Sequence, residues 1–167
     1  MDEYFPILNA QGEIIGKATR KECHSGSMLL HPVVHLHIFR QGGYVYLQKR
    51  ALNKDIQPGK WDTAVGGHVD YGESLEEALF REAREELGLT DINPQKIVNY
   101  IFNSEIEQEM VNVYYIIVGE NFETVNDPIE IDEARFWHID EIEQVMGKGI
   151  LTPNFEQEYN RIKYFIE

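Results

Sequence analysis

The sequence predicts one mixed α/β domain in which helices cover a β-sheet. Its 167 residues are 43% hydrophobic and 26% charged, a balance that suits one globular domain with a real core and excludes a disordered chain. Strand-like apolar runs alternate with helical segments that carry capping residues, and no repeat, linker or low-complexity tract interrupts them. We therefore expect residues 1–167 to form a single domain.

The first part of the chain is predicted to be mainly β-structure. Polar turns that contain glycine separate short runs of β-branched and aromatic residues, which is the pattern of hairpins. The expected elements are a small hairpin over residues 4–8 and 13–16, a short helix over residues 19–23, strands over residues 31–39 and 44–50 that pair as a hairpin, and one short buried strand over residues 61–65.

Residues 74–87 form the most clearly marked helix of the sequence. Ser74 is placed to cap the first turn, and Glu77 is placed to reach back to it, as in a capping box. Gly88 can adopt the left-handed conformation that ends many helices. Both ends of this helix are therefore predicted from local signals alone.

Three strands and two helices are predicted after this helix. They are strands over residues 96–102, 110–118 and 134–137, a helix over residues 139–146, and a last helix that follows Pro153 and Asn154. The last helix places apolar side chains at mostly helical spacing. It should therefore dock on the sheet or at the interface of a homodimer.

Composition excludes several classes of partner. Fifteen Lys and Arg against 29 Asp and Glu give a formal net charge of −14, which argues against a surface that binds duplex nucleic acid through its phosphates. No apolar run approaches the roughly 20 residues that a membrane helix needs. The single cysteine, Cys23, permits no internal disulfide, and the N-terminus lacks a signal-like apolar core. We therefore expect a cytoplasmic protein with neither a membrane nor a nucleic-acid duplex as partner.

An acidic cluster interrupts the apolar side of the helix over residues 74–87. At about 100° per residue, Glu82 falls within roughly 20° of Leu75, so a carboxylate continues a stripe that should be buried. Glu82, Glu85 and Glu86 share an arc of about 100° near the helix C-terminus, where the dipole disfavours negative charge. A solvated face paired with arginines is one interpretation. The other is a hard cation, Mg²⁺ or Mn²⁺, held between the carboxylates.

The same region carries a longer motif, which consists of Gly67, Glu73 and residues 81–89, Arg-Glu-Ala-Arg-Glu-Glu-Leu-Gly-Leu. This motif resembles the Nudix box, the loop-helix-loop signature of hydrolases that cleave diphosphates linked to another group. Every charged or glycine position of the pattern is present, and only Ala83 stands where a bulkier aliphatic residue is more usual. The resemblance implies a Nudix-type α/β/α sandwich with a mixed β-sheet and a hydrolase that acts on acid anhydrides.

The Nudix resemblance also implies roles for five residues. Glu82, Glu85 and Glu86 would be metal ligands, or one of them a base acting on the attacking water. Arg81 and Glu73 would be their orienting partners. The chemistry agrees, because a diphosphate carries several charges that Mg²⁺ or Mn²⁺ must offset before water can attack phosphorus.

Four residues near the motif are candidates for substrate binding. Gly66 and Gly67 lack side chains where the backbone would approach a metal and the substrate, although a plain turn would also explain them. Arg50 and Lys60 precede the glycines and could meet substrate phosphates, whereas surface salt bridges would explain them equally well.

A second resemblance runs from about residue 4 to residue 155 and rests on five segments, which are residues 8–12, His24, residues 30–31, residues 61–68 with 72–74, and residues 107–109. In order and spacing these segments resemble the type I isopentenyl diphosphate isomerases, relatives on the same fold. In that family three histidines and two glutamates hold a metal. The matching positions are His24, His31, His68, Glu107 and Glu109, whose imidazoles and carboxylates favour Zn²⁺, Mn²⁺ or a related ion. Ordinary surface or core histidines and a solvent-facing strand edge are the alternative.

The chain departs from the isomerases at two positions that their chemistry needs. The cysteine of that family falls on Gly66, which has no side chain to transfer a proton, and the aromatic residue that shields the cation falls on Asn154. Glu109 keeps the other proton-transfer position. The isomerases generally lack the full Nudix pattern at the positions of Glu82 and Glu85, so the retained residues are those of a hydrolase.

These observations favour a metal-dependent hydrolase that cleaves the diphosphate linkage of a nucleoside diphosphate derivative or a similar organic diphosphate. Its partner would be that small-molecule substrate, and the group attached to the diphosphate would be recognised by loops whose shape the sequence does not disclose. Two alternatives stay open. They are an enzyme like isopentenyl diphosphate isomerase and a module that binds a diphosphate without turning it over.

Overall fold

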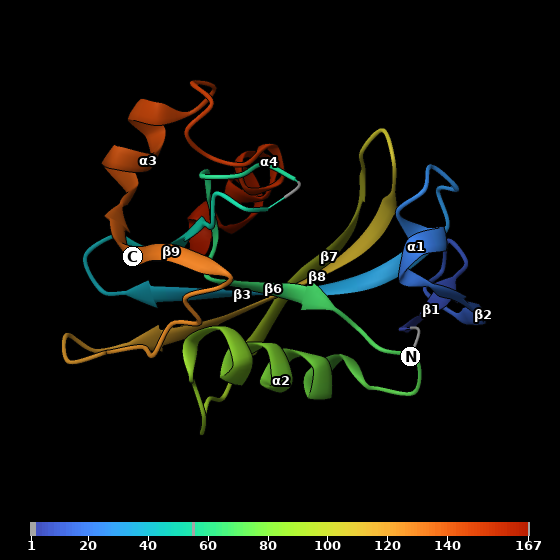
Figure 1. The fold of residues 1–167 in the computed structure, drawn as a ribbon. Helices are drawn as coiled ribbons and strands as arrows, with labels where there is room; N and C mark the ends of the chain where they lie inside the picture. Colours follow the sequence, from blue (N-terminus) through green and yellow to red (C-terminus); the bar gives the residue numbers. More distant parts are fainter. Residues whose placement is uncertain (1–2, 55, 167) are drawn as a thin grey trace.

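A seven-stranded mixed β-sheet lies between helices in the computed structural model of the protein, which describes residues 3–54 and 56–166 (Figure 1). The strands of this sheet are β3 (Leu30–Arg40), β4 (Tyr44–Arg50), β5 (Trp61–Thr63), β6 (Val65–His68), β7 (Gln95–Asn103), β8 (Gln108–Val118) and β9 (Ile131–His138). A separate antiparallel pair consists of β1 (Tyr4–Leu8) and β2 (Ile14–Thr19). The helices are α1 (Arg20–Cys23), α2 (Leu75–Leu87), α3 (Ile139–Val145), α4 (Pro153–Ile162) and the 3-10 helix η1 (Lys163–Phe165).

The layers of the molecule confirm the predicted α/β/α sandwich. Figure 1 shows α2 on one side of the sheet and both α3 and α4 on the other. Alternate residues of β3 divide between these sides, as the period of two requires. Val33 and Phe39 pack in the core with α4, whereas Val34, Leu36 and Ile38 pack in the core with α2.

β3 is the central strand of the sheet. It pairs in parallel with β8 along its whole length and with β6 in antiparallel over residues 33–36. Because β6 lies there, β4 pairs with β3 only at Phe39 and Arg40. The predicted hairpin of residues 31–39 and 44–50 is therefore limited to its turn, and β4 continues beside β5 and β9 instead.

The prediction of one strand over residues 61–65 is wrong, because the chain forms two strands there. β5 pairs with β4, whereas β6 pairs with β3, and Ala64 lies between them. Gln48 of β4 donates a hydrogen bond from Nε2 to the Ala64 carbonyl, at 3.0 Å. Within the described ranges β6 has no strand partner on its second edge, so the sheet divides here and leaves Gly66 and Gly67 partly exposed.

α2 has the ends that its sequence predicts. The Ser74 side chain accepts from the Glu77 amide, and the Glu77 side chain accepts from the Ser74 amide, which completes the capping box. Gly88 ends the helix at φ +65°, in the left-handed region. The apolar side of the helix is buried against the sheet through Ala78, Leu79, Ala83 and Leu87.

α4 docks on the opposite face of the sheet, one of the two placements expected for it. Phe155, Tyr159 and Ile162 are buried in the core on that side. The segment before the helix pairs with β5 in parallel at Trp61 and Leu151, where the amide of Thr152 donates to the carbonyl of Trp61 at 2.9 Å. This contact fixes the start of α4 beside the point where the sheet divides.

Within residues 3–54 and 56–166, no helix is long and apolar enough to span a membrane.

Candidate functional site

Three glutamates lie at the C-terminal end of α2, but they do not all face the same way. The side chains of Glu82 and Glu85 are 16% and 55% exposed, and Glu86 is 9% exposed. Glu86 accepts a hydrogen bond on Oε1 from Gln48 Nε2 at 2.8 Å, while its buried Oε2 has no partner in the described part of the chain. Glu82 and Glu86 therefore converge beneath the sheet, whereas Glu85 lies at the surface.

Arg81 connects these glutamates to the loop before α2. It donates from Nε and Nη2 to the two carboxylate oxygens of Glu73, at 2.8 and 3.0 Å, and from Nη1 to Glu82 Oε1 at 2.8 Å. It also donates from Nη2 to the carbonyl of His68 at 3.0 Å, and its Nη1 lies 3.5 Å from Glu85 Oε2. The hydrogen bonds from Arg81 lower the pKa of Glu73. This network joins the loop, β6 and α2 at one point and orients Glu82.

Gly67 lies directly against Glu82. A Cβ on this residue would be 2.2 Å from Cδ and 2.5 Å from Oε1 of Glu82, closer than side chains can approach. Any larger residue would therefore displace the carboxylate. The structure thus gives Gly67 a reason to be glycine that a plain turn does not supply.

Burial makes the ionised state of the two inner carboxyls unfavourable. It raises the pKa of Glu82, and it raises the pKa of Glu86 well above its usual range, with the charge of Glu82 as a further cause. A cation between such oxygens offsets both effects, and Oε2 of Glu86 has no competing hydrogen bond among the described residues. These oxygens fit a hard divalent cation such as Mg²⁺ or Mn²⁺.

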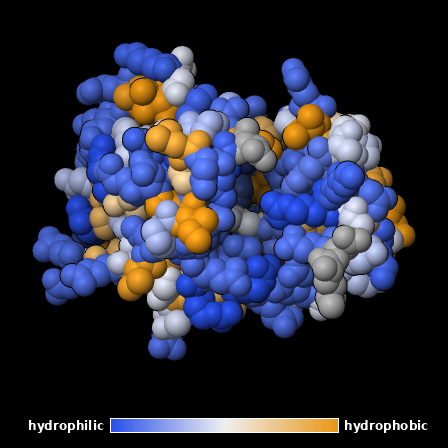
Figure 2. Space-filling view, viewed as in Figure 1, coloured by the Kyte–Doolittle hydropathy of each residue, from blue (hydrophilic) through white to orange (hydrophobic). Residues whose placement is uncertain are grey.

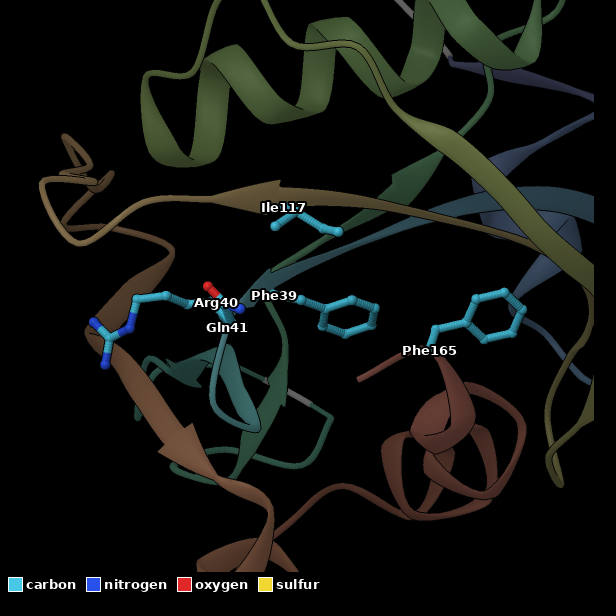
Figure 3. A pocket seen from close by; sticks show the side chains of 5 residues that line it. All are labelled: Phe39, Arg40, Gln41, Ile117 and Phe165. Carbon is cyan, nitrogen blue, oxygen red and sulfur yellow. The ribbon is translucent and has the colours of Figure 1, made fainter. Parts of the chain in front are cut away.

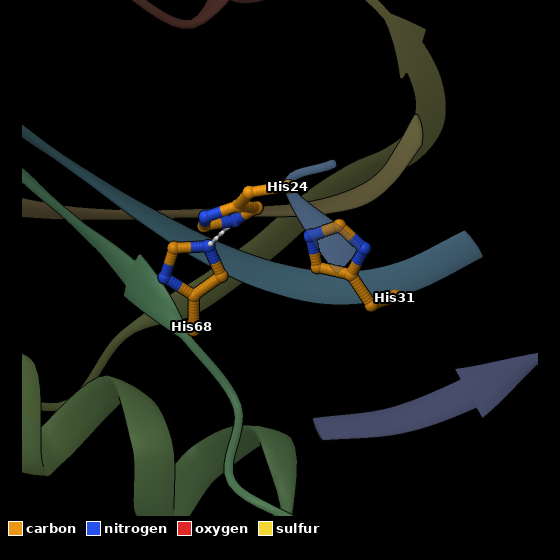
Figure 4. A group of neighbouring side chains, drawn as sticks. All are labelled: His24, His31 and His68. Atoms are coloured by element: carbon orange, nitrogen blue, oxygen red, sulfur yellow. Dashed lines mark hydrogen bonds between the residues drawn. The ribbon is translucent and has the colours of Figure 1, made fainter. Parts of the chain in front are cut away.

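A second group of metal-ligating side chains lies at the N-terminal end of β3, and we refer to it as the histidine cluster: His24, His31, His68, Glu107 and Glu109. Figure 4 shows its three imidazole rings together, with Nε2 of His24 and Nε2 of His68 3.2 Å apart. Ligand atoms of the three histidines all lie within 4.8 Å of one another, and so do those of His31, Glu107 and Glu109. The structure therefore brings together all five residues that the isomerase resemblance singled out.

Neighbouring groups hold the histidine cluster in a form suited to a metal. The ring of Phe5 stacks on His68, with centroids 4.6 Å apart. His31 bonds the Leu29 carbonyl through Nδ1 at 2.9 Å, which leaves its buried Nε2 without a partner in the described part of the chain. Burial lowers the pKa of each of the three cluster histidines, and neutral imidazole is the form that binds metals.

The two glutamates of the histidine cluster flank the start of β8. Glu107 precedes the strand, and its Oε2 lies 3.1 Å from Nε2 of His24. Glu109 lies within the strand, and burial together with the neighbouring Glu107 raises the pKa of Glu109 to about 8. Two like charges held this close favour a bound cation.

The two basic candidates for substrate binding lie at the two ends of the loop that joins β4 to β5, Arg50 as the last residue of β4 and Lys60 just before β5. Arg50 donates from Nε to the Ile56 carbonyl at 3.0 Å, and its Nη1 lies 3.8 Å from Asp62 Oδ2. Lys60 is half-buried just before β5, and no ion pair involves it within the described ranges. The two residues lie side by side, since the amide of Arg50 donates to the carbonyl of Lys60 at 2.9 Å, and the Arg50 side chain already has partners in the protein.

Sequence reasoning missed a buried polar network on the α4 side of the sheet. Its members, apart from Asn154, received no predicted role: His35, His37, Tyr100, Asn154 and Glu158. One signal was available in the sequence. His31, His35 and His37 are separated by even numbers of residues in one strand-like run, so their side chains must lie on the same face of the strand. Nothing local indicates that Glu158 of the last helix reaches them.

Hollows interrupt the surface of the described part of the chain. Figure 2 shows one in this face of the molecule, between the side that carries α3 and α4 and the side that carries α1, β1 and β2, with mainly hydrophilic residues around it. Another hollow, at the C-terminal end of β3, is drawn in Figure 3. It is lined by Phe39, Arg40, Gln41, Ile117 and Phe165, none of which is a predicted site residue.

Comparison with known sequences supports both resemblances. The NUDIX domain family matches residues 29–155. The isopentenyl-diphosphate Delta-isomerase of Escherichia coli O1:K1 is 38% identical over 95 residues, which cover 57% of this chain and 52% of that protein, so the match spans about half the length of that relative. The isopentenyl-diphosphate Delta-isomerase of Aliivibrio fischeri is 30% identical over 156 residues, which cover 87% of this chain and 86% of that protein.

Solved structures support the fold. DR0079 from Deinococcus radiodurans superposes with a TM-score of 0.82 at 21% identity, over 95% of this chain and 98% of that one. The MutT protein of Methanosarcina mazei Go1 gives 0.67 at 25% identity, over 81% and 94%. The NUDIX domain of Shewanella oneidensis NrtR, solved with ADP ribose, gives 0.64 at 17% identity, over 80% and 86%.

Proposed function

The chain belongs to the NUDIX domain family, and we propose that it is a metal-dependent hydrolase that cleaves the diphosphate linkage of a nucleoside diphosphate derivative or a similar organic diphosphate. One observation carries the proposal. Arg81, itself clamped by Glu73, holds the carboxylate of Glu82 against the side-chain-free backbone of Gly67. An oriented, half-buried carboxylate beside open backbone suits a metal–diphosphate site better than it suits a solvated helix face.

Each residue of this site has a proposed task. Glu82, Glu85 and Glu86 would hold Mg²⁺ or Mn²⁺, which when bound would offset the charge of the diphosphate and lower the pKa of the attacking water. One of the three glutamates would accept the proton of that water. Arg81 and Glu73 would keep Glu82 in a single orientation, since outer partners of this kind fix the geometry of ligands.

Further residues of the chain would support binding. Gln48 donates to Oε1 of Glu86, so Oε2, which has no partner in the described part of the chain, would be the oxygen that binds the metal. Gly66 and Gly67 would let the substrate approach the backbone, and Arg50 and Lys60 would meet its phosphates. The histidine cluster would hold a second ion, Zn²⁺, Mn²⁺ or a related metal, because its neutral imidazoles and close carboxylates are the ligands that these ions prefer.

The proposal is tested by phosphorus NMR on a panel of nucleoside diphosphate derivatives with Mg²⁺ or Mn²⁺. The comparison uses wild-type protein, Glu82→Gln, and the control Glu76→Gln, which alters an exposed acid in the first turn of the same helix. Hydrolysis should fall by about 100-fold or more in Glu82→Gln and stay near wild type in the control. Equal rates in all three proteins would remove the assignment.

A second function, isomerisation of isopentenyl diphosphate, is favoured by the histidine cluster and by the names of the similar isomerases. Gly66 and Asn154 weigh against it, because neither can transfer a proton to an alkene or shield a carbocation as a cysteine or an aromatic ring could. Proton NMR of isopentenyl diphosphate with the protein separates the two functions. Migration of the double bond without loss of phosphate would favour the isomerase.

A further inference from the structure

Glu158 is a fully buried carboxylate of α4 to which the proposed function gives no task. Its Oε1 accepts hydrogen bonds from His35 Nδ1 at 2.8 Å and from Tyr100 Oη at 2.6 Å, and its Oε2 is bonded to His37 Nε2. Asn154 Nδ2 donates to Tyr100 Oη at 2.9 Å, so the tyrosine proton is directed to Glu158. Each of the three side chains around the carboxylate therefore donates to it, which is what a buried charge requires.

His35 and His37 both bind Glu158 but differ in what their other ring edge meets. The side chain of His37 is 0% exposed, and its Nδ1 is buried without a partner in the described part of the chain. The side chain of His35 is 12% exposed. A Cβ on Gly66 would lie 3.3 Å from Cδ2 and 3.6 Å from Nε2 of His35. The free edge of the His35 ring therefore faces the open side of Gly66.

The environment of His35 favours its charged form. Burial opposes protonation, but the ion pair and hydrogen bond with Glu158 outweigh it and raise the pKa of His35 to about 9. Asp62 and Glu109 act in the same direction. Because Nδ1–H is donated to Glu158, the imidazolium presents Nε2–H as its remaining donor. No acceptor within residues 3–54 and 56–166 takes this hydrogen bond.

The free edge of β6 connects His35 to the proposed diphosphate site. Consecutive residues of a strand point to opposite faces, so the open side of Gly67 faces Glu82 and the open side of Gly66 faces His35. Because both residues are glycines, no side chain of Gly66 or Gly67 separates a ligand at this edge from His35 or from Glu82. β6 also has no strand partner on this edge within the described ranges. A ligand along the edge can therefore contact Glu82 on one face and His35 on the other.

We propose that His35, oriented by Glu158, is a substrate-binding residue that donates a hydrogen bond from Nε2 to a phosphoryl oxygen of the diphosphate. The proposal rests on the proposed function, since it assigns a further contact at the same site. Tyr100 is a positioning residue, because it donates to Oε1 of Glu158, the oxygen that fixes the His35 ring, whereas His37 bonds the other oxygen. Charge-assisted hydrogen bonds to phosphate are strong, which gives a buried ion pair next to the glycines a purpose beyond anchoring α4.

The test compares His35→Gln with His37→Gln, a matched control on the same strand that contacts the same carboxylate but is closed off from Gly66. The probe is methylenediphosphonate, a diphosphate analogue that resists hydrolysis, titrated in Mg²⁺ by calorimetry. His35→Gln should weaken binding by about 10-fold or more, and His37→Gln should stay within about threefold of wild type. With a compound that the wild type hydrolyses, His35→Gln should raise KM and change kcat by only a few-fold.

A measurement on the wild type keeps the proposal testable if a variant fails to fold. Histidine ¹⁵N NMR should show a protonated Nε2 in His35 at neutral pH and a change in its shift when methylenediphosphonate binds. An unchanged His35 signal on binding overturns the proposal. So does equal weakening by the two variants, since that would make the network only an anchor for α4.

The outcomes also separate this proposal from the proposed function. If the wild type hydrolyses diphosphates and His35→Gln binds the probe as tightly as wild type, only the role of His35 fails. If Glu82→Gln hydrolyses as fast as wild type, the proposed function fails whatever His35 does. The calorimetric and NMR arms report on His35 independently of turnover.

Discussion

The carboxylate of Glu82 occupies the space that a side chain on Gly67 would need, since a Cβ on Gly67 would lie 2.2 Å from Cδ of Glu82. The residues come from different elements, β6 and α2, and Arg81 holds the carboxylate in place through a hydrogen bond to its Oε1. A site built this closely has little tolerance for displacement, because reacting groups misplaced by about 1 Å can lose about 100-fold in rate.

The first prediction concerns Gly67→Ala. The added methyl group pushes the Glu82 carboxylate away from β6, so hydrolysis should fall by about 100-fold, while circular dichroism should show a folded protein. Gly16→Ala is the control, because a Cβ at Gly16 meets nothing within 4 Å. Full activity in Gly67→Ala would show that the position of Glu82 does not matter for the reaction.

The second prediction concerns Arg81→Lys. Lysine keeps the charge but cannot bond both oxygens of Glu73 while also reaching Glu82, so activity should fall by about 10- to 100-fold. Arg84→Lys, an exposed change on the same helix, should have little effect. Steady-state rates at saturating Mg²⁺ provide the measurement, and a retained rate in Arg81→Lys would mean that orientation by Arg81 is unimportant.

The third prediction concerns the histidine cluster. Zn²⁺ or Mn²⁺ should raise the Tm of the wild type, because an ion that binds only the folded state stabilises it, and a chelator should reverse the change. His24→Gln removes one ligand and should reduce the shift. His138→Gln, which alters a histidine outside the cluster, should keep it. A Tm that does not respond to either metal would contradict a metal site here.

The fourth prediction concerns pH and His35. A group whose pKa is raised on folding stabilises the protein fully below its unfolded pKa, about 6.5, and this contribution is lost as pH rises through the folded pKa, about 9. The free energy of unfolding should therefore decline across this window by an amount on the order of 3 kcal/mol from this residue. Glu109, with its pKa raised to about 8, titrates in the same window. The comparison of wild type with His35→Gln in urea therefore measures what His35 contributes, including its lowering of the Glu109 pKa, and parallel pH profiles would contradict the prediction.

Much of the fold and of the α2 site could be predicted because its signals are local. Ser74, Glu77 and Gly88 mark the ends of α2 through contacts within a few residues. The position of Glu82 on the buried stripe follows from helix geometry, whereas its contact with Gly67 depends on how β6 packs against α2. A structural feature that depends only on contacts within one or two turns of the same helix can therefore be predicted from the sequence.

The remaining features depend on which distant segments meet. The division between β5 and β6 arises because β6 replaces β4 beside β3, and strand order is not encoded in a run of residues 61–65. The contact of Glu158 with His35 joins residues far apart in the chain. The sequence alone predicts that a glutamate on a helix is exposed to solvent, so only the tertiary packing shows that Glu158 is buried.

The most direct test of the central claim is hydrolysis in ¹⁸O-labelled water, with the products followed by phosphorus NMR. If a water held at the α2 carboxylates attacks phosphorus, the wild type should place ¹⁸O in a phosphoryl product, visible as an isotope shift, and Glu82→Gln should do so at least about 100-fold more slowly. Phosphoryl products without ¹⁸O, or label incorporated at the wild-type rate in Glu82→Gln, would contradict the account.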